Sequence, residues 1–563
     1  MAPTAKHNFK TIRKGAEIRA FCVFGKGGFE MAQGNIQKDG YNHMISAENG
    51  QTLLAVFRAE GFAVASPCGG NGTCGKCKVV AHGMLSEMTE DERRFLRPDE
   101  IEAGIRLACK TKIKGDFEVV LPSAELSAET RFQALSYTLS PMAELVSDEK
   151  NFGLAVDIGT TTVAVYLCDM ETGKILGTRG FANPQSAYGA DVISRIDKIM
   201  KNKTALTEQK QRVLDAISEA CRTLAEENGG DASHIRAAVI CGNTVMEHIA
   251  AEIDPTSIAN APFIAPTLFG ECYDAKTIGL PMADGAKIYF APCFASYVGG
   301  DIACGMIAVG LDKEADNVLF IDIGTNGEIG LSTKNGLYFC SAAAGPAFEG
   351  AHIECGMAGT AGAVSRVYLD GDKILWETVD GKTPCGICGS GIIDACAVML
   401  DTGLLDETGC IMDADEVERF SEYLDEDDDG NTVFMLDKIN HIYITGKDIR
   451  EIQLAKAAIA AGIRTLLEKA ELKISDVSAV MLAGGFGSHI DAKSACRIGL
   501  IPRELDGKVT SVGNVAGAGA VAILLGKEPR ESARTICGKS EYIELSCDAF
   551  FMEAYIDEMM FEE

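Results

Sequence analysis

Two short loops of matching composition carry residues suited to phosphate and metal binding. Each follows an apolar run and contains an Asp, a Gly and small polar side chains. The first Asp loop (157–161) contains Asp157, Gly159, Thr160 and Thr161, and the second Asp loop (322–326) contains Asp322, Gly324, Thr325 and Asn326. A carboxylate can hold Mg²⁺ directly or through water, glycine lets backbone N–H groups approach a phosphate, and Thr or Asn adds neutral donors. The pair predicts two similar lobes facing one another across a polyphosphate, with each loop joining two strands.

A third glycine-rich turn strengthens this interpretation, because a single Asp-x-Gly turn is more often an ordinary β-turn than a site. Gly484, Gly485 and Gly487 follow the strand-like run 480–483. With these motifs, residues 152–525 resemble the superfamily of actin, sugar kinases and heat-shock chaperones. The resemblance implies an α/β fold of two duplicated, ribonuclease H-like lobes with ATP between them. It also implies phosphate and Mg²⁺ at the two Asp loops and the adenosine at the Gly-Gly turn. The spacing does not decide whether Asp157 or Asp322 is the general base.

Four cysteines near the N-terminus have the spacing of a metal site. Cys68, Cys74 and Cys77 lie in a glycine-rich loop and Cys109 stands further on, which gives C-x5-C-x2-C…C. This is close to the plant-type ferredoxin spacing C-x4-C-x2-C…C, and the extra residue resembles the adrenodoxin-like and bacterial variants. A loop without bulky side chains can point several N–H groups at a [2Fe–2S] cluster. The alternative, a four-thiolate zinc site, usually has two close Cys pairs, so we expect iron–sulfur in an α+β, β-grasp ferredoxin-like domain.

A second C-x2-C is formed by Cys385 and Cys388. Because no equally good pair stands nearby, we expect these two residues to be buried thiols rather than a second metal site.

The order of motifs divides the chain into six parts. These are a basic N-terminal arm (1–43) without an assigned role, a ferredoxin-like domain (44–123), a linker (124–150), two ATPase lobes (151–312 and 313–530) and an acidic tail packed on the ATPase (531–563). The linker is rich in Ser, Ala, Glu and Thr and lacks a long apolar period, which would let a small redox domain move relative to a large one.

The composition sets limits on the class of protein. A chain of 563 residues with 47% hydrophobic and 24% charged residues is typical of a multidomain globular protein. No apolar run reaches the ~18 residues needed to span a bilayer and no signal peptide is evident, so we expect a cytoplasmic protein without a membrane partner. The net charge of −29 argues against nucleic acid. Without an export signal, the 20 cysteines do not indicate a disulfide framework.

Taken whole, the chain resembles the reductive activators of corrinoid proteins. The matching parts are the four-cysteine domain, the three glycine-containing loops, the segments 183–191, 341–357 and 388–394, and the tail near 544–561. The resemblance implies an ATP-hydrolysing iron–sulfur reductase that reduces inactive cob(II)alamin to cob(I)alamin on a partner corrinoid protein of an anaerobic methyltransferase system. It also implies an upstream low-potential electron donor, and it leaves a homodimer open.

Three alternatives use the same motifs. An activator of 2-hydroxyacyl-CoA dehydratases also joins ATP to low-potential electrons, but members of that family share a cluster between two subunits. A small-molecule kinase would use the same loops without needing a ferredoxin. A ferredoxin on an ATP-sensing scaffold would bind the nucleotide without hydrolysing it.

Overall fold

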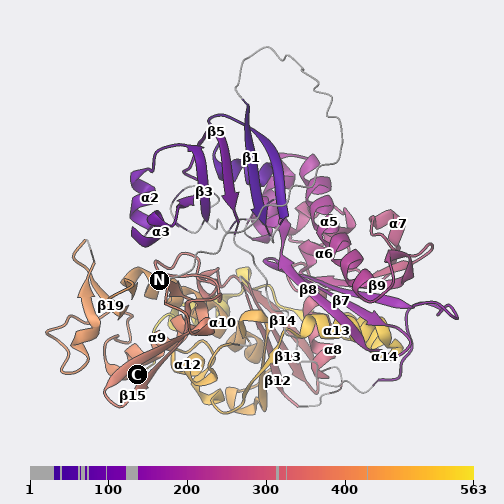
Figure 1. Cartoon of the computed structure of the whole chain (residues 1–563). Helices are drawn as coiled ribbons and strands as arrows, with labels where there is room; N and C mark the ends of the chain where they lie inside the picture. The colour runs from indigo at the N-terminus through magenta and orange to yellow at the C-terminus, as the bar shows by residue number, and fades with distance from the viewer. Residues whose placement is uncertain are drawn as a thin grey trace, which may run out of the picture.

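The computed structural model describes residues 31–562 except 39–40, 61, 63, 65–69, 71, 73–74, 76, 97, 122–136, 190, 312, 314–315, 325, 428 and 488. Three bodies follow one another along the chain, and the first of them, drawn in indigo, stands beside α5 of the second (Figure 1). Every helix among the described residues is too short or too polar to span a bilayer.

The first body is a five-stranded sheet in the order β2-β1-β5-β3-β4, with β1 and β5 parallel at its centre. Residues along β5 alternate between buried and exposed, as expected for a strand with one face on a core. The elements are β1 (Met31–Lys38), β2 (Tyr41–Glu48), α1 (Leu53–Glu60), β3 (Lys78–Leu85), α2 (Glu90–Phe95), α3 (Pro98–Glu102), β4 (Ile105–Leu107) and β5 (Ile113–Val120).

One expectation fails in this domain. The N-terminal arm was expected to reach residue 43, but β1 and most of the β1–β2 hairpin fall inside that range, so the ferredoxin-like sheet begins by Met31. Strand β1 buries only Ala32, Gly34 and Ile36 on alternate positions, and two of these are too small to give a clear hydrophobic signal. Residues 1–30 lie outside the described part of the chain.

The second body, the first lobe, is a six-stranded sheet in the order β10-β11-β9-β6-β7-β8. Its strands are β6 (Phe152–Ile158), β7 (Thr162–Asp169), β8 (Ile175–Ala182), β9 (Ile235–Gly242), β10 (Cys272–Asp274) and β11 (Lys287–Phe290). Its helices are α4 (Val192–Lys201), α5 (Thr204–Glu227), α6 (Thr244–Ala251), α7 (Ala275–Ile278) and α8 (Gly300–Val309). Strand β6 is buried along its whole length, as expected for a central strand covered on both faces.

The third body, the second lobe, repeats this arrangement in the order β22-β21-β12-β13-β14-β23. The sheet strands are β12 (Val318–Ile323), β13 (Gly327–Thr333), β14 (Gly336–Ala342), β21 (Ala479–Ala483), β22 (Val509–Gly513) and β23 (Ser540–Tyr542). Two smaller sheets contain β15 (Ala363–Asp370), β16 (Lys373–Thr378), β17 (Gly386–Ile387), β18 (Leu424–Glu426), β19 (Thr432–Asp437) and β20 (Ile442–Ile444). The helices are α9 (Gly389–Thr402), α10 (Gly446–Lys469), α11 (Gly484–Gly487), α12 (Ala492–Arg497), α13 (Val515–Leu525), α14 (Lys527–Lys539) and α15 (Ala549–Asp557).

The two lobes share one hydrophobic core as well as having their own. Helix α13 follows the second lobe's sheet strand β22 but packs on α8 and β6 of the first lobe. The contact is close, because a Cβ on Gly519 would lie 1.8 Å from the carbonyl oxygen of Cys304. The rings of Phe294 and Phe339, one from each lobe, stack with centroids 3.9 Å apart. This shared core joins the two lobes.

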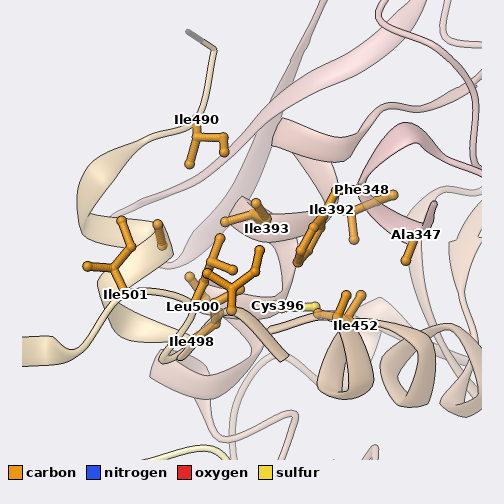
Figure 2. Close-up of a cluster of buried hydrophobic side chains, with 14 of the residues drawn as sticks. Ala347, Phe348, Ile392, Ile393, Cys396, Ile452, Ile490, Ile498, Leu500 and Ile501 are labelled. Carbon is orange, nitrogen blue, oxygen red and sulfur yellow. The ribbon is translucent and has the colours of Figure 1, made fainter. Parts of the chain in front are cut away.

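The core of the second lobe surrounds α10, whose inward side chains are fully buried. Figure 2 shows Ile392, Ile393 and Cys396 of α9 meeting Ile452 of α10 and the side chains that follow α12. The C-terminal segment packs on the outer side of this core, where α15 lies along α10 and Phe561 is buried.

Candidate functional site: a carboxylate cleft and a cysteine loop

The two Asp loops occupy equivalent places in the two sheets. Asp157 is the second-last residue of β6 and Asp322 is the second-last residue of β12, and each of these strands lies between an antiparallel and a parallel neighbour. Each Asp is therefore delivered to the same edge of its sheet, where the chain turns sharply into the next strand. The fold confirms the prediction of duplicated α/β lobes.

A third carboxylate joins these two. Asp301 lies in the first turn of α8, after the pair Gly299 and Gly300, and its Oδ1 accepts a hydrogen bond from the backbone N–H of Ile302. Among the described residues, none of Asp157, Asp301 and Asp322 forms an ion pair with a cation. Their mutual repulsion is thus not offset by a positive side chain.

The pKa values record this crowding. The pKa of Asp157 is raised to about 8, chiefly by burial and then by the charges of Asp301 and Asp322, while a hydrogen bond with Asn514 opposes the shift. Burial and the charge of Asp301 raise the pKa of Asp322 to about 7. Burial raises the pKa of Asp301 to about 6. Buried like charges of this kind favour either protonation or a bound cation.

Glu328 adds a fourth carboxylate from β13, directly opposite Asp322 in the antiparallel register. Its pKa lies well above the ordinary value because it is buried and because Asp301 and Asp322 are negatively charged. Among the described residues, no three Asp, Glu, His or Cys side chains converge tightly enough to form a metal site by themselves. The carboxylates of Asp157, Asp301, Asp322 and Glu328 together define the carboxylate cleft.

The Gly-Gly turn meets the second Asp loop. Gly484 has φ +87, and a Cβ at this position would lie 2.3 Å from Oδ1 of Asp322. At Gly485 a Cβ would meet no atom of the described residues within 4 Å, which leaves space in front of Gly485 among them. Gly487 ends the short helix α11 that this turn forms. Thr325 lies outside the described residues.

Buried polar side chains hold the first Asp loop from behind. Asn183 Nδ2 donates to the Gly159 carbonyl at 2.8 Å, and the Asn183 backbone N–H donates to the Thr161 carbonyl at 2.8 Å. Arg195 donates to the Thr160 carbonyl at 2.6 Å, and burial lowers its pKa to about 10. These three hydrogen bonds fix the backbone of the first Asp loop.

Two of the four expected cluster cysteines lie among the described residues, and they are adjacent. The backbone N–H of Cys109 donates to Cys77 Sγ at 3.4 Å. Cys68 and Cys74 lie outside the described residues. A Cβ on Gly72 would lie 1.8 Å from Lys110 Cε, and one on Gly75 would lie 2.8 Å from the Phe95 ring. An amide of one cysteine that donates to the sulfur of the other, and two glycine positions without room for a side chain, fit a [2Fe–2S] cluster.

The second cysteine pair differs in part from expectation. Cys388 is buried at the start of α9, as expected for a structural thiol. Cys385 is exposed, and its Sγ lies 3.7 Å from Met357 Sδ, so the expectation that both thiols are buried is wrong for Cys385. Cys385 lies immediately before strand β17. The two residues of that strand, Gly386 and Ile387, are buried, whereas Cys385 is outside it.

Sequence reasoning did not assign a site role to Asp301 or Glu328. A signal was present for both, because Asp301 follows a Gly-Gly pair and Glu328 stands two residues after the second Asp loop. Neither signal shows by itself that α8 and β13 bring these carboxylates beside Asp157 and Asp322.

The fold and the two sites define a class of protein: a ferredoxin-like domain joined to a two-lobed ATPase of the actin and sugar-kinase type. Family models agree along the chain. A 2Fe-2S iron-sulfur cluster binding domain matches residues 36–114, the RACo middle region matches 152–314, and the C-terminal domain of RACo, the ASKHA domain, matches 316–563.

Curated and solved relatives narrow the class. The corrinoid activation enzyme RamQ of Eubacterium limosum is 35% identical over 74% of this chain and 72% of its own length. A reductase of a Co(II) methylated amine-specific corrinoid protein from Methanosarcina barkeri is 25% identical over 73% of this chain and 77% of its own length. A solved reductive activator for corrinoid, iron-sulfur protein is 31% identical, with a TM-score of 0.67 over 94% of this chain and 98% of that one. The chain belongs to the family of reductive activators of corrinoid proteins.

Proposed function

We propose that this chain reduces the cobalt of a partner corrinoid protein from Co(II) to Co(I) in an anaerobic methyl-transfer system, with hydrolysis of ATP to ADP and phosphate. The observation that carries the proposal is the presence in one chain of two different sites. One is the contact between Cys109 and Cys77 of the glycine-rich loop, and the other is the carboxylate cleft, where the charge of Asp322 acts on Asp157. Family membership supports the same conclusion.

Cys68, Cys74, Cys77 and Cys109 would hold the cluster. When bound, a [2Fe–2S] cluster of this type supplies one electron at about −400 mV, and an external low-potential donor must then return one electron to it. The chain's own contribution comes from the described residues around Cys77. The Cys109 N–H hydrogen bond to Cys77 stabilises negative charge on sulfur, and the closed glycine positions keep side chains away.

The cleft would bind ATP with Mg²⁺. Asp157 and Asp322 would hold the cation, directly or through water, and orient the attacking water, with Asp301 and Glu328 close behind them. The loop residues Gly159, Thr160, Thr161, Gly324, Thr325 and Asn326 would hold the phosphates. Gly484, Gly485 and Gly487 would face the nucleoside, where the open space before Gly485 leaves room.

Nucleotide binding would be coupled to closure of the lobes because each lobe contributes carboxylates to the cleft. Asp157 and Asp301 belong to the first lobe and Asp322 and Glu328 to the second, so a nucleotide-bound Mg²⁺ that is attracted to carboxylates of both lobes favours the closed cleft. A ligand shifts a conformational equilibrium only by its differential affinity for the two states. Closure in a complex with the corrinoid protein would change the environment of the cobalt so that it accepts the electron.

The direct test is anaerobic mixing of reduced protein, Mg²⁺-ATP and candidate corrinoid proteins while the cobalt absorption bands are followed. We expect Co(I) to form only with nucleotide present, and the variants Asp157→Asn and Asp322→Asn to lose both ATP turnover and Co(I) formation. Full ATP turnover in both variants would remove the site assignment. Equal Co(I) formation without nucleotide would remove the proposed coupling.

A further inference from the structure

Arg212 joins the ferredoxin-like domain to the first lobe. It lies on α5, and its NH2 donates to the carbonyls of Arg58 at 2.9 Å and Ala59 at 3.2 Å. These carbonyls belong to the last turn of α1, where helical carbonyls lack partners within the helix. A cation at a helix C-terminus is also favoured by the helix dipole. The contact therefore suits both the charge and the donors of an arginine.

The docked helix leads directly to the cluster loop. Arg58 is near the end of α1, and a Cβ built on Gly70 of that loop would lie 3.6 Å from Arg58 NH1. One residue thus lies against the cluster loop with its side chain and is held by Arg212 through its carbonyl. A shift of α1 relative to α5 would therefore change the position of Arg58 against Gly70 in the loop that carries three of the cysteines.

Arg212 is itself held by Tyr188. Its Nε donates to the Tyr188 hydroxyl at 3.2 Å, and its guanidinium carbon lies 5.6 Å from the centre of the Tyr188 ring. The same hydroxyl donates to Glu208 at 3.0 Å. An arginine held by a ring and a hydroxyl is pre-oriented for its carbonyl acceptors.

Tyr188 closes the turn that supports the first Asp loop. It follows the 3₁₀ helix η1 (Pro184–Ala187), whose N-terminal cap is Asn183. Asn183 is fully buried and holds the carbonyls of Gly159 and Thr161. The turn is also tied to α5, because Gln185 Nε2 donates to the Gln209 carbonyl at 3.4 Å. A continuous set of contacts thus runs from the first Asp loop to Arg212.

We propose that Arg212 docks the ferredoxin-like domain on the first lobe and, through Tyr188 and the Asn183 turn, makes this docking respond to nucleotide at the first Asp loop. The inference rests on the proposed function only in that the loop binds nucleotide. It adds a series of contacts through which nucleotide binding in the cleft would change the position of the cluster loop in the same chain. Such a route requires a demonstrated response at both ends, which the following experiment measures.

The experiment is hydrogen–deuterium exchange on the cluster-loaded protein, with and without Mg²⁺ and a non-hydrolysable ATP analogue. In the wild type we expect the analogue to change the exchange rate of α1 amides by at least about threefold. Arg212→Ala should abolish this response while leaving the response of the first Asp loop intact. Arg222→Ala is the matched control, because Arg222 lies on the same helix and pairs only with Glu219 at the surface among the described residues.

A conservative variant separates docking from charge. Arg212→Lys keeps the cation but lacks the planar fork that reaches Tyr188 and the α1 carbonyls together, so we expect a partial response. In corrinoid reduction, Arg212→Ala should keep ATP turnover within about twofold and lower Co(I) formed per ATP by about tenfold.

The outcomes are distinct. A nucleotide response of α1 that is equal in Arg212→Ala and wild type, or that is absent from the wild type while the first Asp loop responds, would overturn the inference. If the wild type shows the exchange response but never forms Co(I), the proposed function fails and the docking contact stands. If nucleotide changes neither α1 nor the first Asp loop, both fail.

Discussion

The backbone of Gly484 lies against the carboxylate of Asp322, so closely that a Cβ at position 484 would sit 2.3 Å from Oδ1. Strand β21 runs parallel to β12, and this pairing places the turn after one strand beside the acidic end of the other. The Gly-Gly turn and the second Asp loop are thus in direct contact and form one site.

Gly484→Ala should disable the cleft. The added methyl group would collide with Asp322, and φ +87 is a conformation that residues with a Cβ adopt only with strain of about 1–3 kcal/mol. We expect ATP turnover to fall at least about tenfold. Gly538→Ala in α14 is the control, because a Cβ at this position would meet no atom within 4 Å in the described part of the chain. Wild-type turnover in Gly484→Ala would show that this contact does not shape the site.

The carboxylate cleft predicts that the nucleotide-free protein loses stability as pH rises. The pKa of Asp157 is raised from 3.8 to about 8 and that of Asp322 to about 7, so the folded protein keeps protons that the unfolded chain has released. Where the folded state binds more protons, the free energy of unfolding falls with rising pH, here between about pH 4 and about pH 8. Urea unfolding at several pH values measures this slope.

Two comparisons check the origin of that slope. Asp157→Asn should flatten it, whereas Asp274→Asn should not, because hydrogen bonds with Lys287 and Lys276 lower the pKa of the exposed Asp274. Mg²⁺ with ATP analogue should also flatten the slope, since a bound cation favours the ionised carboxylates. A slope that Asp157→Asn leaves unchanged would place its source elsewhere.

Cluster content should depend on the described cysteine pair. Cys77→Ser and Cys109→Ser should each yield protein with strongly reduced iron and acid-labile sulfide, because each removes one thiolate ligand. Cys547→Ser, at an exposed thiol in the tail, should keep wild-type iron content. Iron and sulfide assays on anaerobically purified protein give the answer, and full iron content in Cys77→Ser would remove that residue from the ligand set.

The C-terminal segment should contribute measurably to the stability of the second lobe. Lys456 is fully buried, donates to the Met560 carbonyl, and its Nζ lies 5.2 Å from the centre of the Phe561 ring. Lys456→Met leaves that carbonyl without its donor, so we expect a loss of about 1–3 kcal/mol in the free energy of unfolding. Lys438→Met, at a surface ion pair, should change it by less than about 0.5 kcal/mol. Equal effects would argue against a structural role for the segment.

Local motifs made much of the fold predictable. An Asp and a Gly stand together in the turns at 157–161 and 322–326, and three glycines stand in the turn at 484–487, so all three turns can be recognised in the sequence. The glycine-rich cysteine loop is equally local. Strand β1 was missed because its buried positions include the small residues Ala32 and Gly34, and the exposure of Cys385 depends on how far β17 extends.

By itself the sequence determined which residues could do chemistry: four thiols at a cluster spacing and two acidic turns after apolar strands. Only the tertiary structure decided that Asp301 and Glu328 join Asp157 and Asp322, and that Arg212 reaches the end of α1. The physical reason is the separation in the sequence between the residues that interact. A turn is specified by neighbours a few residues apart, whereas the field in the cleft and the contact between domains arise from side chains that folding alone brings together.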